Sequence, residues 1–235
     1  MKSIILWATM LLVSTLSFAQ HEGFDKLLKN NITEDGVVNY KGIIKEREIL
    51  DNYITHLKFT TPEEKWSDDK AKAFYINAYN AYTILLIVDN YPLKSIMKIN
   101  KGGKDAWHQK FVVVGGKTYS LNDIEHEILR KKYSDPRIHV GVNCASFSCP
   151  PIANFAFTEA NVEAELERLM KKFINDPARN MITAKKITLS KIFEWYKGDF
   201  TKNGSLVAYI NAYAEVELTK KTKVRYMEYN WNLNE

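Results

Sequence analysis

The sequence predicts an α+β fold, in which a single helix-rich domain with short strands and hairpins packs around a central buried helix. The main observation is the segment from Ala73 to Val88, which carries no formal charge and is apolar on nearly every side. A helix with no polar face is typical of the buried centre of a domain. Helical and strand-like segments follow one another without a regular βαβ order, which favours α+β over a wound parallel sheet.

The N-terminal segment predicts export. Lys2 is followed by an apolar run over residues 4–16 and by the small-residue site Ser17-Phe-Ala19, the pattern of a cleaved signal peptide over residues 1–19. An uncleaved anchor is the alternative. Residues 20–235 contain no linker-like stretch, so they are expected to form one domain without a membrane span, in the periplasm or outside the cell.

Charge and composition limit the partners. The formal net charge is +5, but basic and acidic residues are interspersed along the chain. This mixed pattern argues against a nucleic-acid-binding protein. We expect no cofactor and no metal, and a small-molecule, peptide or glycan ligand.

The first half of the domain is expected to be mainly helical. Apolar residues recur at helical spacing over residues 24–31 and 40–59. Thr61-Pro-Glu-Glu64 has the pattern of a helix start, and Ser67 caps a second start that opens a helix to about Asn90. Residues 111–120 predict a hairpin turning at Gly115-Gly116, and residues 121–133 predict a helix.

The second half mixes strands and helices. Residues 137–144 alternate and predict a strand, and Thr158 is expected to cap a helix that ends near Asn175. A second hairpin is expected over residues 181–189, helices over 190–197 and 205–218, and a final strand over 224–231.

The segment from Arg137 to Pro151 contains both cysteines of the chain, Cys144 and Cys149, together with His139. Three interpretations of the cysteines compete: a Cys144–Cys149 disulfide, a nucleophilic thiol with a histidine as its base, and a metal site. The spacings typical of zinc sites are missing, which argues against metal. In a regular strand Cys144 would face away from His139, so a dyad of these two residues requires a break at Asn143.

Two other segments carry polar residues on apolar faces. Glu125 lies beside the apolar stripe of its helix, with Arg137, Arg130 or a histidine as its expected partner, while His126 and Arg130 share another face. Asn77 and Asn80 lie in the apolar central helix, where a buried amide needs a partner. They are expected either to brace a neighbouring loop or to line an active site.

Six motifs of the chain occur in the same order in a known family. They are Val37-Val-Asn-Tyr40, Ala73-Phe-Tyr-Ile-Asn-Ala-Tyr-Asn80, Leu121-Asn-Asp-Ile-Glu-His126, Asp135-Pro-Arg-Ile-His139, Asn143-Cys-Ala-Ser-Phe-Ser-Cys-Pro-Pro151 and Tyr229-Asn-Trp-Asn-Leu-Asn234. In these motifs the chain resembles the family called domain of unknown function 547. The resemblance implies an exported bacterial form without the coiled coil of the plant members. It implies no particular activity.

The leading functional hypothesis is a thiol-dependent hydrolase or acyl transferase. Cys144 would be the nucleophile, His139 or His126 the base, and Glu125 or an asparagine the group that orients this base. Asn77 or backbone amides after Cys144 would donate to an oxyanion, and Asn80, Asn143 and Arg137 would serve binding. The alternative is a non-catalytic exported binding module, in which Cys144 and Cys149 form a disulfide. Its ligand would contact exposed aromatic residues such as Trp66, Trp107 and Trp195.

Overall fold

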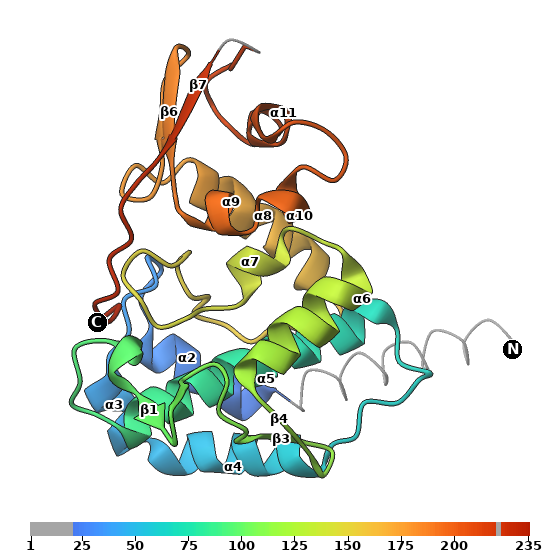
Figure 1. The fold of residues 1–235 in the computed structure, drawn as a ribbon. Helices are drawn as coiled ribbons and strands as arrows, with labels where there is room; N and C mark the ends of the chain where they lie inside the picture. The colour runs from blue at the N-terminus through green and yellow to red at the C-terminus, as the bar shows by residue number, and fades with distance from the viewer. Residues whose placement is uncertain (1–20, 220–221) are drawn as a thin grey trace, which may run out of the picture.

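The computed structural model describes residues 21–219 and 222–235 (Figure 1). The predicted signal peptide over residues 1–19 lies outside this part of the chain. Within it the fold is α+β, with many helices and small two- and three-stranded sheets, as the sequence predicts. In the described ranges, no helix combines the length and the apolar character that a membrane span requires.

The N-terminal helices are α2 (Glu22–Asn31), α3 (Tyr40–Lys45) and α4 (Arg47–Phe59). The continuous helix predicted over 40–59 is broken at Glu46, whose carboxylate accepts hydrogen bonds from Asn30 and Asn31 of α2. The helix start predicted at Thr61 is wrong. The glycine turn at Gly115 packs against the backbone of Thr61, and residues 61–66 stay irregular.

Helix α5 (Asp68–Asp89) is the centre of the molecule, as predicted. The Ser67 side chain caps it by accepting a hydrogen bond from the Lys70 amide at 3.1 Å. It contacts α3, α4, the helical segment η2 (Asp123–Arg130) and α8 (Val162–Ile174). In Figure 1 this helix crosses the molecule between α4 and η2.

Short elements connect α5 to the site. They are η1 (Ile96–Lys98), β1 (Asn100–Lys101), β2 (Lys104–Asp105), the predicted hairpin β3 (Val112–Val114) and β4 (Lys117–Tyr119), η2, and α6 (Lys131–Tyr133). The predicted helix over 121–133 is present, but η2 within it has π-helical geometry. The α8 helix begins at Val162 with Asn161 as its cap residue, so the predicted cap at Thr158 is wrong. The carbonyl of Thr158 instead accepts hydrogen bonds from the backbone amides of Asn161 and Val162.

The strand predicted over 137–144 is wrong. Residues Ile138–Gly141 form a helical turn, α7. Asp135 and Pro136 start this turn: the carbonyl of Asp135 accepts from the Ile138 amide at 3.2 Å, and that of Pro136 from the His139 amide at 3.3 Å. The Asp135 carboxylate also accepts from the Arg137 amide at 2.9 Å, the local capping that aspartate favours. The alternation in the sequence therefore reflects a buried helical turn.

The C-terminal elements are β5 (Met181–Ile182), β6 (Lys186–Leu189), α9 (Ile192–Trp195), α10 (Lys197–Phe200), α11 (Leu206–Asn211) and β7 (Lys223–Tyr226). The second predicted hairpin is present, and β7 pairs with β6 in parallel. The helix predicted over 205–218 ends at Asn211, because the Asn211 side chain bonds the amide and carbonyl of Leu218. The strand predicted over 224–231 ends at Tyr226, and the chain then returns to pair Leu233 with Ser146.

Candidate functional site

A cavity of about 300 Å³ lies where η2, α7, the cysteine loop, α9 and the C-terminal segment meet. Its wall is mostly apolar and aromatic, but it carries a thiol pair, imidazoles and a carboxylate. The lining residues are Tyr79, Trp107, His108, Asn122, Glu125, His126, His139, Val142, Cys144, Cys149, Ile192, Trp195, Tyr196, Tyr229 and Trp231. A concave, largely apolar site with a few convergent polar groups is the usual form of a ligand-binding or active site.

Two buried asparagines hold the cysteine loop, defined here as residues 142–151. The Asn80 side chain donates to the Gly141 carbonyl at 2.8 Å and accepts from the Asn143 amide at 2.9 Å. Asn143 in turn accepts from the Ala145 amide at 2.8 Å and donates to the Pro150 carbonyl at 2.9 Å. Asn80 and Asn143 therefore brace the loop, and the Ala145 amide is not free to bind an oxyanion.

Replacing Asn80 by alanine should destabilise the protein by about 2–4 kcal/mol, because it leaves a buried amide and a buried carbonyl without partners. Chemical denaturation measures this change. Asn90→Ala is the matched control, because Asn90 lies on the surface end of the same helix and bonds only the Leu86 carbonyl. Equal stabilities of the two variants would contradict the bracing role.

Hydrogen-bond donors surround the sulfur of Cys144. The Cys149 sulfur lies at 3.1 Å, the Ser146 hydroxyl at 3.1 Å and the Tyr229 hydroxyl at 3.2 Å, and the Ser146 backbone amide also contributes. The hydrogen bond from Cys149 is the largest influence on the pKa of Cys144; burial opposes it, and the contacts with Ser146 and Tyr229 reinforce it. Together they lower this pKa from 9.0 to about 7. Burial instead raises the pKa of Cys149 well above its usual value.

The two cysteines are free thiols in this structure. Their sulfurs are 3.1 Å apart, beyond the roughly 2.05 Å of a disulfide bond. Both cysteines line the cavity, Cys144 half-buried and Cys149 buried. Cys149 is the donor between the two sulfurs when Cys144 is ionised.

His139 forms a pair with Asp199. Its Nε2 lies 2.8 Å from the Asp199 carboxylate, and its ring stacks on Tyr196 with 4.0 Å between centroids. Arg130 holds the same carboxylate with two hydrogen bonds of 2.7 and 3.0 Å. Burial would raise the pKa of Asp199, but the hydrogen bonds from His139 and Arg130 outweigh it and hold this pKa well below its usual value.

The Asp199 pair fixes the tautomer of His139. An ionised carboxylate only accepts, so Nε2 of His139 carries a proton and Nδ1 is the acceptor nitrogen of the neutral ring. Asp199 comes from α10, some sixty residues from His139 along the chain, and it orients the histidine in the place that we assigned to Glu125 or an asparagine.

Glu125 and His126 lie on the π-helical segment η2, a geometry that often marks functional sites. Arg130 Nη1 lies 2.8 Å from His126 Nδ1, as their shared helix face predicts. Arginine can only donate, so His126 Nδ1 accepts and Nε2 carries the proton. Burial lowers the pKa of His126; the charge of Glu125 opposes this and that of Arg130 adds to it.

Glu125 is buried, with 6% of its surface exposed. Its hydrogen-bond partner is Tyr196, the residue that stacks on His139. Burial and the nearby Glu125 carboxylate both raise the pKa of Tyr196, so this phenol stays protonated and donates to Glu125. Arg137, which the sequence suggested as a partner of Glu125, does not reach it.

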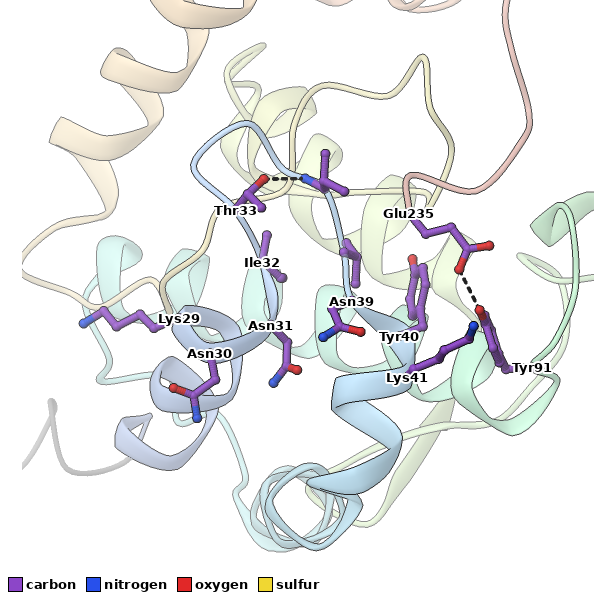
Figure 2. Close-up of a pocket in the computed structure, with 12 residues that line it drawn as sticks. Lys29, Asn30, Asn31, Ile32, Thr33, Asn39, Tyr40, Lys41, Tyr91 and Glu235 are labelled. Atoms are coloured by element: carbon purple, nitrogen blue, oxygen red, sulfur yellow. Dashed lines mark hydrogen bonds between the residues drawn. The ribbon is translucent and has the colours of Figure 1, made fainter.

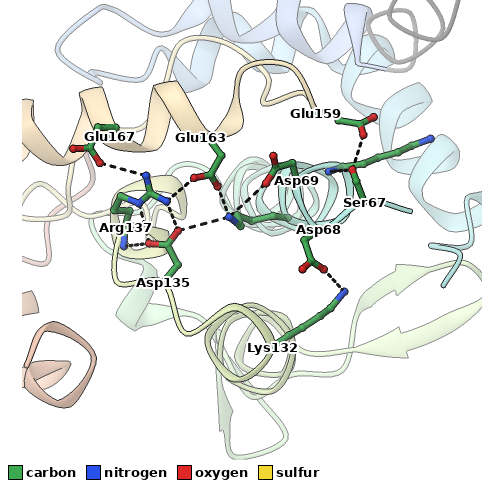
Figure 3. Close-up of polar contacts among 11 residues, drawn as sticks. Ser67, Asp68, Asp69, Lys132, Asp135, Arg137, Glu159, Glu163 and Glu167 are labelled. Carbon is green, nitrogen blue, oxygen red and sulfur yellow. Dashed lines mark hydrogen bonds and ion pairs between the residues drawn. The ribbon is translucent and has the colours of Figure 1, made fainter. Parts of the chain in front are cut away.

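Arg137 is instead part of an ionic network on the far side of α7 (Figure 3). It bonds Asp135 at 2.8 Å, Glu163 at 2.6 Å and Glu167 at 3.3 Å. Lys72 of α5 joins the network through Glu163 and Asp135. The guanidinium is thus occupied by three carboxylates, and it ties α7 to α8 rather than lining the cavity.

Asn77 also lies outside the cavity. Its side chain donates to the Phe157 carbonyl at 2.7 Å and accepts from the Phe157 amide at 2.9 Å. Both ends of this amide are occupied by the backbone before α8, so its expected role as an oxyanion donor is wrong. Asn77 and Asn80 were expected either to brace a neighbouring loop or to line an active site, and in the structure both brace backbone segments.

The expected hydrogen bond between Cys144 and a histidine is absent from the described residues. The partners of the Cys144 sulfur are Cys149, Ser146 and Tyr229. His139 and His126 nevertheless line the same cavity as Cys144. In unliganded active sites, catalytic hydrogen bonds are often long and tighten only around a substrate.

A larger hollow, of about 670 Å³, lies on another face, beside α3 and the C-terminal residue (Figure 2). Its lining residues include Asn39, Tyr40 and Lys41, and the hydroxyl of Tyr91 bonds Glu235 there at 2.8 Å. Neither cysteine nor histidine lines it. The smaller cavity is therefore the one whose wall carries cysteine and histidine side chains. Across the described part of the chain, no three His, Cys, Asp or Glu side chains are placed to hold a metal ion.

The comparisons with known proteins identify the class of domain. Residues 63–174 match the family model described as "Protein of unknown function, DUF547", and the chain is a member of that family. The match covers α5, η2, the cysteine loop and α8, but Asp199 and Tyr229 lie beyond it. No curated protein and no solved structure matches the chain significantly.

Sequence reasoning missed four residues of the site, Ser146, Tyr196, Asp199 and Tyr229. Tyr229 lies in a motif that carries the family resemblance, and Ser146 lies in the cysteine loop, so both had a signal. Asp199 lies in a short segment without a recognisable motif, and only the fold places it beside His139.

Proposed function

We propose that the protein is an exported thiol-dependent hydrolase or acyl transferase whose nucleophile is Cys144. One observation carries this proposal: a thiol with its pKa lowered to about 7 shares a ligand-sized cavity with the His139–Asp199 pair. A thiol of this pKa is about half ionised at neutral pH, and the thiolate is the nucleophilic form. Export, to the periplasm or the medium, rests on the signal-like residues 1–19.

The reaction would run through a thioester. The Cys144 thiolate attacks the carbonyl carbon of an ester, thioester or amide, and a negative charge develops on the carbonyl oxygen. The C–S bond stays when the tetrahedral intermediate collapses, the bond to the leaving group breaks, and a water molecule supplies the proton that the leaving group takes up. Water in the hydrolase reaction, or another nucleophile in the transferase reaction, then attacks the thioester carbonyl and gives its proton to His139. The C–S bond breaks, the acyl product leaves, and Cys144 returns to its thiolate form.

The two histidines would have different roles. His139 presents Nδ1 as the acceptor of a neutral ring, while Asp199 holds Nε2–H, so His139 can take a proton from the attacking water or acceptor. His126 has its proton on Nε2 and its Nδ1 occupied by Arg130, so it acts as a hydrogen-bond donor to the developing oxyanion. Glu125 acts through Tyr196, which holds the His139 ring by stacking.

A non-catalytic binding module remains the second candidate, favoured by the aromatic wall. Trp107, Trp195 and Trp231 line the cavity, whereas Trp66 packs against Phe74 elsewhere. In this alternative, oxidation joins Cys144 to Cys149, whose sulfurs already touch, and the cavity binds a glycan, peptide or small molecule without reacting.

The pH dependence of alkylation tests the activated thiol. Under reducing conditions, the rate of iodoacetamide reaction at Cys144 should rise with pH and reach its half-maximum at about 7, because only the thiolate reacts. Tyr229→Phe should move this midpoint to higher pH, since it removes an O–H donor to the thiolate. Mass spectrometry of the Cys144 peptide gives the rate at each pH.

Tyr226→Phe is the control, because Tyr226 lies on β7 and does not line the cavity. It should leave the midpoint unchanged. A midpoint near 9.0 in the native protein, equal to that of an ordinary thiol, would contradict the proposed function. So would a Cys144–Cys149 disulfide that resists mild reductant.

A further inference from the structure

The carboxylate of Glu125 is the starting observation. It lies in the cavity wall and is 94% buried, with 6% of the residue exposed. Among the described residues, no lysine, arginine or histidine nitrogen lies within 4.0 Å of it. A buried carboxylate normally has a cationic partner, because removing an isolated charge from water is costly.

The basic groups nearest to Glu125 are committed elsewhere. Arg130 gives two hydrogen bonds to Asp199 and a third contact to His126. His139 is paired with the same Asp199. His126 is held in its neutral form, since burial and Arg130 lower its pKa. Among the described residues that line the cavity, Glu125 is therefore the one acidic side chain, and the basic groups beside it already have other partners.

Aromatic rings form the rest of the wall. Tyr229 lies 4.7 Å from Trp195 and 4.5 Å from Trp231 between ring centroids, and Trp107 lies 5.8 Å from Trp231. Trp195 is 47% exposed, so this cluster reaches from the cavity to the surface. The faces of such rings attract cations, most strongly when the site excludes water.

We propose that the cavity binds an ammonium group, with Glu125 as its counter-ion and the rings of Trp195, Tyr229 and Trp231 as the surrounding cage. The inference rests on the proposed function in naming the substrate class: an acyl compound that carries a primary or quaternary ammonium near the reacting carbonyl. Ammonium binding itself requires no reaction at Cys144. The volume of about 300 Å³ suits a small ligand or the charged end of a larger one.

Calorimetric titration with a matched pair of probes tests the inference. Choline carries a trimethylammonium group, and 3,3-dimethylbutan-1-ol has the same shape without the charge. The wild-type protein should bind choline at least about tenfold more tightly than the neutral alcohol, because only choline gains from the carboxylate and the ring faces. n-Butylammonium, compared with n-butanol, tests a primary ammonium in the same way.

Glu125→Gln should weaken choline binding at least about tenfold and leave the binding of the alcohol unchanged. Glu127→Gln is the matched control on the same helix, because Glu127 is exposed, pairs with Lys131 and does not line the cavity. It should bind choline as the wild type does. If Glu125→Gln does not fold, as judged by circular dichroism, the affinities of the wild-type protein for choline and for the neutral alcohol test the inference on their own.

Equal affinities for choline and the alcohol, or no binding of either ammonium probe, would overturn the inference. Cys144→Ala separates it from the proposed function. This variant should still bind choline. If Cys144 of the wild type proves unreactive while choline binding is intact, the acyl-transfer mechanism is wrong and the ammonium site stands. If Cys144 is reactive but the protein binds choline no more tightly than the neutral alcohol, the proposed substrate class is wrong and the acyl-transfer mechanism stands.

Discussion

His139→Ala and Asp199→Asn are each expected to lower the turnover of p-nitrophenyl acetate by about 10²- to 10⁴-fold. His139 supplies the acceptor nitrogen that takes a proton from the attacking water, and Asp199 fixes its tautomer through the 2.8 Å contact with Nε2. Acylation should suffer less than deacylation, since the hydrogen bonds from Cys149, Ser146 and Tyr229 stabilise the Cys144 thiolate without a histidine. Stopped-flow release of p-nitrophenol should therefore show a retained burst and a slower steady state.

Asp51→Asn is the matched control for Asp199→Asn. Asp51 is also an aspartate paired with an arginine, Arg47, at 2.7 Å, but both residues lie on α4 and neither lines the cavity. Its turnover should equal that of the wild type. If His139→Ala turned over the ester at the wild-type rate while remaining folded, His139 would not be the base, and the pair with Asp199 would be structural.

The fold was largely predictable from the sequence because its strongest signal is a packing constraint. A segment that is apolar on all sides has to be surrounded, and α5 is. The hairpin over residues 111–120 followed from a glycine turn between strand-like runs, and the one over residues 181–189 from its strand-like runs alone. The signals that failed were local ones. Thr61-Pro-Glu-Glu64 has every feature of a helix start, yet the turn at Gly115 occupies the space beside it.

The sequence allowed us to predict which segments line the site, but not which side chains within it are hydrogen-bonded to each other. Cys144, His139, Glu125 and His126 do line one cavity. The expected strand over 137–144 was the main error, because α7 turns His139 toward α10 rather than toward Cys144. Alternation over a few residues does not distinguish a buried helical turn from a strand.

The roles of the asparagines and of Asp199 required the three-dimensional structure. Asn77 and Asn80 have the same residue type on the same helix, and only their neighbours show that one braces Phe157 and the other Gly141. Asp199 is joined to His139 through contacts between α10 and α7, and no spacing in the sequence encodes such a pairing. The π-helical geometry of η2 was equally invisible in its apolar periodicity.

Cys144→Ala is expected to lower the turnover of p-nitrophenyl acetate by about 10³-fold or more, because it removes the atom that forms the covalent bond. Cys149→Ala should retain the nucleophile but lose its strongest hydrogen-bond donor, which raises the pKa of Cys144. At neutral pH this variant should be about tenfold slower, and its rate should recover as the pH rises. The contrast between the two variants assigns the nucleophile to one sulfur of the pair.

The central claim is that Cys144 forms a covalent acyl intermediate, and trapping that intermediate tests it most directly. Rapid acid quenching of the His139→Ala variant with p-nitrophenyl acetate, followed by peptide mass spectrometry, should find one acetyl group on Cys144. The Cys149 sulfur should remain unmodified, because Cys149 is buried and burial raises its pKa. Absence of acetylation at Cys144, or labelling of both cysteines only after unfolding, would contradict the account.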